Sequence, residues 1–203
     1  MPDVATRATD TRTLIVNAAR RRLLADGYGA MSTRKVAEEA GVPLSQLHYH
    51  FGSKQGLILT LLEEENQRRL TRQQQMYAED APLWQRYERA CDFLEEDLDS
   101  GYVRVLQEMI AAGWSDDEVA RPVLAIVQAW IDVLQAVATE AEARFGSLGP
   151  FTAAELSALV GLSFLGGEAM ILLGDDAWAA RVRGALRRVG DLIRTLEERS
   201  PTT

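Results

Sequence analysis

The feature that most constrains the fold is the spacing of apolar residues, which recur every three to four positions along nearly the whole chain. Strand signals are nearly absent, because the one Asp-Gly pair, Asp26-Gly27, follows a helical pattern instead of joining two alternating runs. Gly, Pro and Ser residues interrupt the helical pattern at intervals. The sequence therefore predicts an all-α protein of about nine helices.

The breaks set the expected helix bounds. Ser32 or Thr33 supplies a hydroxyl to begin the second helix, and Gly41 ends it. Gly27 is expected to end the first helix, and Ser53 to cap the fourth. Pro122, near the start of the longest helix, marks either a delayed start or a kink. Apart from the second helix, the expected helices cover about 11–26, 43–51, 54–78, 82–99, 101–112, 116–145, 152–173 and 176–198.

Composition excludes several classes of protein. A chain of 203 residues, 47% hydrophobic and 26% charged, is an ordinary globular protein of one or two domains. Cys91 is the single cysteine, so the chain has no internal disulfide, and a reducing compartment, the cytoplasm, is expected. The N-terminus lacks the apolar run of a signal peptide, and the apolar stretch around residues 123–138 carries Gln128, Asp132 and Gln135. We therefore expect no membrane span.

Charge is distributed unevenly along the chain. Residues 1–54 carry 8 basic and 5 acidic side chains, whereas residues 55–203 carry 14 and 25. A basic N-terminal quarter on an acidic body indicates an anion-binding module joined to a second domain, although an imbalance of this size also arises by chance.

The segment from Ser32 to Lys54 carries the clearest functional signal. It predicts two short helices around a Gly-containing turn, the layout of a helix-turn-helix. On a helical wheel of residues 43–51, Leu44, Leu47 and Phe51 share a buried face. The opposite face presents Ser45, Gln46 and Tyr49, with His48 and His50 at its flanks. Hydrogen-bonding and aromatic groups on the outside of a short helix suit the major groove of DNA.

A run of residues without gaps identifies a family. It comprises Gly27-Tyr28, Ser32-Thr33-x-x-Val36-Ala37-x-x-Ala40-Gly41-Val42, Leu47-His48-Tyr49-His50-Phe51 and Ser53-Lys54. This segment, about residues 11–60, resembles the DNA-binding domain of the tetracycline-repressor (TetR) family of bacterial transcriptional regulators. The resemblance implies a three-helix DNA-binding domain over residues 1–54 and a helical ligand-binding and dimerisation domain over residues 55–203. It also implies that the third helix lies in the major groove.

Three positions depart from the family pattern. Pro43 offers no hydroxyl where the family often has Ser or Thr, and His48 replaces a Tyr that usually contacts phosphate. Leu44 and Ser45 stand where longer polar side chains are frequent, which leaves Gln46 as the long amide able to contact adenine. Leu44 either packs in the core or touches a thymine methyl group. The expected DNA-contacting residues are Thr33, Arg34, Pro43, Leu44, Ser45, Gln46, His48, Tyr49, His50 and Lys54.

We expect no metal site and no cofactor. His48 and His50 are the chain's two histidines, and at i and i+2 on a helix they diverge too far to bind one ion. The sequence also lacks a Gly-rich phosphate loop, a GxSxG elbow, an HExxH motif and a CxxC motif. These absences argue against an enzyme.

The body is expected to bind a small molecule and to form a homodimer, both as implications of the resemblance. The second-last helix is apolar, and its Gly161, Gly166 and Gly167 allow close approach, whereas the last helix is arginine-rich. These two helices either pair with their copies in a second subunit or pack together inside one monomer. Glu168 either pairs with Arg183 or Arg187 or binds a polar group of the ligand. The residues expected to line an apolar pocket are Trp84, Tyr87, Cys91, Met109, Trp114, Trp130, Phe164 and Glu168. Packing in the core is the alternative for the aromatic residues, Cys91 and Met109.

The sequence thus predicts a ligand-responsive transcriptional regulator. In this reading a homodimer binds a palindromic double-stranded DNA operator as a repressor, and a small apolar or amphipathic effector releases it. The alternative is an all-α interaction protein whose helix-turn-helix does not bind DNA. A role for Cys91 as a redox sensor would require an exposed thiol with a lowered pKa.

Overall fold

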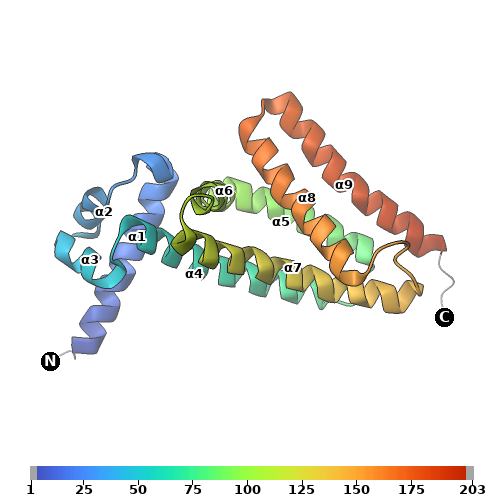
Figure 1. Ribbon diagram of the computed structural model, residues 1–203, viewed down its shortest axis with the longest axis horizontal. Coiled ribbons are helices and arrows are strands. Elements are labelled where there is room, and N and C mark those ends of the chain that lie inside the picture. The colour runs from blue at the N-terminus through green and yellow to red at the C-terminus, as the bar shows by residue number, and fades with distance from the viewer. Residues whose placement is uncertain (1–3, 200–203) are drawn as a thin grey trace. The chain divides into compact units, whose positions relative to one another are not determined.

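The computed structural model describes residues 4–199, and these residues form nine α-helices and no strand (Figure 1). Each expected helix is present, and the predicted all-α fold is confirmed. The helices are α1 (Val4–Ala30), α2 (Thr33–Ala40), α3 (Leu44–Phe51), α4 (Lys54–Tyr77), α5 (Leu83–Asp99), α6 (Tyr102–Gly113), α7 (Asp117–Phe145), α8 (Ala153–Leu173) and α9 (Asp176–Arg199).

Short polar residues begin several of these helices, and the sequence predicted two of them, Ser32 and Ser53. The Ser32 hydroxyl accepts the backbone N–H of Lys35 at 3.3 Å, and the Ser53 hydroxyl accepts that of Gly56 at 3.0 Å. Thr152 and Glu155 form a reciprocal capping box at the start of α8. These bonds satisfy backbone donors that the first helical turn leaves without partners, so the helix starts are encoded locally.

One helix differs in extent from the expectation. Gly27 does leave helical geometry, with φ 71° and ψ 169°, but helical backbone resumes and continues to Ala30. The same helix begins at Val4, before the expected residue 11. Pro122 lies inside α7, which starts at Asp117, so the proline does not delay the helix. It lies five residues after Asp117, beyond the first turn, so its missing N–H removes one helical hydrogen bond, to the carbonyl of Glu118.

The chain divides into two compact units. One contains the residues up to Asn66 together with Val105–Val123, and the other contains Gln67–Arg104 together with the residues from Leu124 onward. In the first unit, α1, α2 and α3 pack together around Ile15, Ala19, Val36 and Leu47, which are all fully buried. In the second unit, α9 packs against both α5 and α8 (Figure 1).

Polar and close contacts fix the position of α9 in the second unit. Tyr87 on α5 donates its hydroxyl to the carbonyl of Leu186 at 3.0 Å. A Cβ on Gly167 of α8 would lie 3.0 Å from the Leu186 side chain, so the close approach predicted at this glycine is confirmed. Gly166, in contrast, faces open space.

Two arginines of α9 bind α5. Arg183 donates to Glu95 at 2.9 Å, and Arg187 donates to Asp92 at 2.8 Å. The sequence offers these two arginines as partners of Glu168 on α8, and in the structure both contact carboxylates on α5. The reason is topological: α9 lies against two helices, and the ion pairs form on the α5 side.

Two helices, α7 and α8, are long and apolar enough to cross a membrane by length and composition. In the apolar window of α8 only 11% of the residues are buried. The sequence predicted no membrane span, because the apolar stretch of α7 carries Gln128, Asp132 and Gln135. An apolar helix this exposed has a surface that another molecule is expected to cover.

Candidate nucleic-acid interface and cavity

The helix-turn-helix is built on a tight turn between α2 and α3. Gly41 adopts the left-handed conformation, with φ 67° and ψ 30°, which glycine tolerates without a steric penalty. The N–H of Val42 then bonds to the carbonyl of Ala37 at 3.0 Å, closing the end of α2. Pro43 precedes α3 and makes no side-chain cap. The turn therefore fixes the direction in which α3 leaves α2.

One face of α3 is buried and the other is open to solvent. Leu47 is fully buried, Phe51 is 9% exposed, and Leu44 is half-buried, as the helical wheel predicted. Ser45 and Gln46 are exposed, and Tyr49 is 80% exposed. The Tyr49 ring is thus exposed to solvent beside the Gln46 amide and the Ser45 hydroxyl. Together these groups give α3 a surface suited to contact with base edges and phosphates.

The histidines of α3 have different environments. His48 is exposed, and its Nδ1 lies 3.0 Å from the carbonyl oxygen of Gly52, so Nδ1 carries the proton and donates. Nε2 is then an acceptor in neutral His48 and can donate to a phosphate only in the imidazolium form. His50 is half-buried, and its ring packs edge-on against Tyr49 with the centroids 5.1 Å apart.

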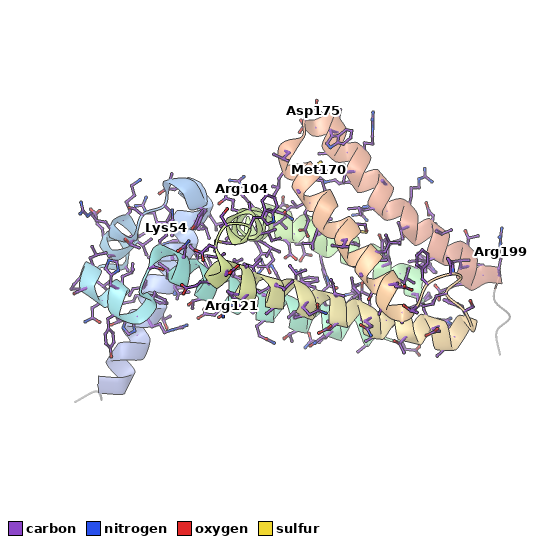
Figure 2. The ribbon with its side chains drawn as sticks, viewed as in Figure 1. Lys54, Arg104, Arg121, Met170, Asp175 and Arg199 are labelled. Atoms are coloured by element: carbon purple, nitrogen blue, oxygen red, sulfur yellow. The ribbon has the colours of Figure 1, made fainter. Side chains whose placement is uncertain are left out.

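Lys54 lies at the start of α4 (Figure 2), and Tyr28 at the end of α1 holds its ammonium group. Its ammonium donates to the Tyr28 carbonyl oxygen and lies 4.3 Å from the centroid of the Tyr28 ring. An ammonium has three N–H donors, so this contact leaves donors for a phosphate while restricting where the phosphate can lie. The sequence predicts that Lys54 contacts a phosphate, but it does not predict the contact between Lys54 and Tyr28.

Tyr28 also connects the helix-turn-helix to α6. Its backbone N–H donates to the Glu108 carboxylate at 3.1 Å, and Gln55 on α4 donates to Asp116 at 3.3 Å. Burial, together with the negative charges of Glu108 and Asp116, raises the pKa of Tyr28. All of these residues belong to the first unit. Glu108 was missed in the sequence because 80 residues separate it from its partner, and no local pattern links the two.

Most of the basic charge on α1 is neutralised within the same unit. Arg12 pairs with Glu64 and Arg20 with Glu65, both at 2.8 Å. Arg21 and Arg22 both pair with Glu39, at 2.6 and 2.5 Å. These contacts lower the pKa of Glu39. The hydrogen bond from Arg21 has the largest effect, and the positive charges of Arg22 and Arg21 add to it. The charge available to an anion therefore lies on α2 and α4. Arg34 is exposed, Lys35 is exposed but lies 3.8 Å from Asp26, and the neutral Thr33 is half-exposed.

A cavity of about 470 Å³ lies in the second unit, between α4 and α7. Its volume is within the range of small-molecule sites. The residues that line it are Leu70, Gln74, Tyr77, Ala129, Asp132, Val133, Ala136, Val137 and Glu140.

The residues that the sequence suggested for a ligand pocket lie elsewhere. Tyr87 and Phe164 pack edge to face with ring centroids 5.8 Å apart, and Arg194 lies 4.9 Å from the Trp84 ring. Cys91 and Met109 are buried, whereas Trp130 and Glu168 are half-buried. Trp114 is 82% exposed, in the connection between α6 and α7. Met109 and Trp114 belong to the first unit and the other six to the second.

The buried Cys91 does not have the environment of a redox sensor. Desolvation raises the pKa of its thiol to about 11, and the opposing effect of Arg187 is smaller. At neutral pH the thiol stays protonated, and a protonated thiol is a poor nucleophile.

Comparison with known proteins finds matches to the helix-turn-helix region. Residues 15–61 match the model of the bacterial regulatory proteins of the tetR family. The HTH-type transcriptional regulator UidR of Escherichia coli strain K12 is 32% identical over 72 residues. This match covers 36% of the chain and 37% of UidR. The matching proteins are transcriptional regulators and not enzymes.

Solved structures share the fold over nearly the whole chain. A putative transcriptional regulator from Saccharomonospora viridis in complex with choline has a TM-score of 0.74 at 19% identity, covering 90% of this chain and 96% of that one. The regulator FadR of Bacillus subtilis in complex with stearoyl-CoA has a TM-score of 0.70 at 14% identity, covering 89% and 96%. Residues 15–61 are thus similar to the tetR family of bacterial regulatory proteins, and over nearly its whole length the chain has the fold of solved regulators.

Proposed function

We propose that this protein is a ligand-responsive transcriptional regulator that represses from a palindromic DNA operator and is released by a small apolar or amphipathic molecule. The observation that carries the proposal is the exposed polar face of α3, on a helix whose opposite face is anchored by the fully buried Leu47. A rigid helix with Gln46 and Tyr49 outward meets the steric and hydrogen-bonding needs of the major groove. Residues 1–54 form the DNA-binding part in this proposal.

The proposed contacts with DNA fall into two groups, those that read bases and those that bind phosphates. Gln46 is placed to form a bidentate contact with adenine, and Ser45 and Tyr49 flank it on the exposed face of α3. Thr33 and Arg34 at the start of α2, and Lys54 at the start of α4, supply phosphate donors. Leu44 is half-buried, which supports its packing role together with limited contact to a thymine methyl group. Pro43, His48 and His50 complete the edge of the surface.

We propose a homodimer formed by α8 and α9, within the ligand-binding and dimerisation domain of residues 55–203. The exposed apolar residues of α8 recur at positions that share one helical face, and Gly166 on the same face allows a close approach. The exposed residues are Leu159, Leu162, Met170 and Leu173 on α8, joined by Leu192 and Leu196 on α9. Two such helix pairs related by a two-fold axis form a four-helix interface. Covering this face with a second copy accounts for its apolar character in a cytoplasmic protein.

The response to an effector requires contacts between the DNA-binding helices and a helix of the body. Glu108 of α6 holds the backbone of Tyr28, and Tyr28 holds Lys54. A movement of α6 would therefore disturb a residue that we assign to phosphate binding. Relatives of this fold have been solved with choline and with stearoyl-CoA, which supports an effector site but leaves its chemistry open.

Fluorescence anisotropy on the DNA upstream of the protein's own gene tests the proposal. Specific binding that weakens steeply with salt is expected, because phosphate contacts release counterions. Gln46→Ala should lose about tenfold in affinity and relax the base preference at one position of each half-site, the effect of one lost bidentate contact. The matched control is Gln67→Ala, an exposed glutamine on α4 outside the helix-turn-helix.

The outcomes separate the proposal from the alternative of an interaction protein. Absence of DNA binding at low salt would favour that alternative and refute the regulator. Equal losses in Gln46→Ala and Gln67→Ala would remove the readout role of Gln46.

Analytical ultracentrifugation tests the interface. Leu162→Arg is expected to yield monomers and to abolish operator binding, because two half-sites are then no longer read together. Leu124→Arg is the control, because Leu124 is an exposed leucine of α7 outside the proposed interface. A Leu162→Arg dimer as stable as the wild type would refute the assignment of α8.

A further inference from the structure

The walls of the cavity between α4 and α7 are apolar at most positions, and the remaining positions carry one amide and two carboxylates. Leucine, valine and alanine side chains form the apolar part, and Tyr77 adds an aromatic ring. Gln74, Asp132 and Glu140 supply the polar groups, and no lysine, arginine or histidine lines the cavity. The electrostatic environment of a molecule in this cavity is therefore set by two carboxylates.

The two carboxylates differ in how their charge is balanced. Glu140 is bound by the guanidinium of Arg86, which is itself only 4% exposed and also donates to the carbonyl of Tyr77. Asp132 accepts a hydrogen bond from Gln128 at 2.9 Å. The amide of Gln128 is neutral, so this contact leaves the negative charge of Asp132 in place. Asp132 is thus the group that gives the cavity its charge.

The geometry favours a ligand with an apolar body and a positive charge. A volume of about 470 Å³ accepts a molecule larger than a simple inorganic ion. The Tyr77 ring can attract a cation through its π face, and the carboxylate of Asp132 adds a direct charge interaction. An anion of the same size would meet the Asp132 carboxylate without a basic side chain on the cavity wall to offset it.

We propose that this cavity binds an organic cation with an apolar body, and that Asp132 selects its charge. The inference rests on the proposed function, because it names the chemical class of the effector. It assigns the site to α4 and α7 and not to the aromatic residues of α5 and α8 that the sequence had suggested.

Calorimetric titration of the full chain with tetraphenylphosphonium and tetraphenylborate tests the charge preference. The two ions have nearly the same shape and apolar surface and differ in the sign of the charge. Tetraphenylphosphonium is expected to bind, and tetraphenylborate is expected to bind at least tenfold more weakly. Equal binding of the two ions, tighter binding of the borate, or binding of neither ion would overturn the inference.

Two variants locate the site. Asp132→Asn keeps the size of the side chain and should weaken phosphonium binding about tenfold, the effect of one carboxylate near the protein surface. Glu142→Gln is the control, because Glu142 is an exposed carboxylate on α7 that does not line the cavity. Ala136→Trp, at an exposed position of the wall, should fill the cavity and abolish phosphonium binding. Wild-type affinity in both Asp132→Asn and Ala136→Trp would place any binding elsewhere and overturn the inference.

Operator binding is measured on the same samples without either ion. If the wild type shows no specific DNA binding, the proposed function is refuted, whatever the phosphonium titration shows. Specific operator binding without phosphonium binding refutes the cation site alone. Binding of phosphonium that lowers operator affinity supports both.

Discussion

Glu197, near the end of α9, caps the start of α5 across the second unit. Its carboxylate accepts the backbone N–H of Leu83 at 3.1 Å and that of Trp84 at 3.0 Å. The side chain is 7% exposed, and Arg144 contacts it at 3.0 Å. Pro82, which precedes α5, makes no side-chain cap of its own. The first turn of α5 therefore depends on a residue more than 110 positions away for its hydrogen-bond acceptor.

Replacing Glu197 should destabilise the protein by an amount that its contacts set. Hydrogen bonds to a charged group contribute roughly 1.5–3 kcal/mol each, and part of this is recovered when water reaches the freed N–H groups. We expect Glu197→Ala to lower the free energy of unfolding by about 3 kcal/mol. Glu197→Gln should lower it by about half as much, because one amide oxygen replaces two carboxylate oxygens. For a chain of this size, a loss of about 3 kcal/mol lowers the Tm by roughly 6–12 °C.

Urea and thermal unfolding followed by circular dichroism provide the measurement. Glu198→Ala is the matched control, because Glu198 is the exposed neighbour, and it should change stability by less than about 0.5 kcal/mol. Arg144→Ala separates the ion pair from the cap and should lose less than about 1 kcal/mol, because Arg144 is 51% exposed. If Glu197→Ala and Glu198→Ala unfold within about 0.5 kcal/mol of each other, the capping argument is refuted.

Three further predictions concern single residues. Ser32→Ala removes the cap of α2 and should lower the free energy of unfolding by about 1 kcal/mol in urea titrations, whereas an unchanged midpoint would contradict the capping role. Gly41→Ala should lower it by about 1–2 kcal/mol in the same assay, because alanine is strained at φ 67°. The raised pKa of Cys91, about 11, keeps the native thiol protonated, so iodoacetamide at pH 8 should react far more slowly with native than with unfolded protein. Since the unfolded state loses this proton first, near the ordinary value of 9, the stability that Cys91 contributes should fall as pH rises from about 9 to 11.

Local sequence patterns determined most of the helix bounds and the candidate interface. The caps at Ser32 and Ser53 and the left-handed Gly41 act within three or four residues of the chain, so each is readable without the fold. The buried and exposed faces of α3 follow from the 3.6-residue period in the same way, and Leu47 and Tyr49 lie on the predicted sides. The assignment of the DNA-contacting residues remains a prediction.

Tertiary structure alone decided the contacts between distant segments. The anchoring of Tyr28 by Glu108, the cap of α5 by Glu197 and the pairing of Arg183 with Glu95 join residues 80 to 114 positions apart. The cavity around Asp132 likewise exists only because α4 and α7 lie next to each other. Periodicity specifies which face of a helix is buried but not which helix covers it. Long side chains such as glutamate and arginine then take whichever partner the packing brings within reach, and no local pattern records that choice.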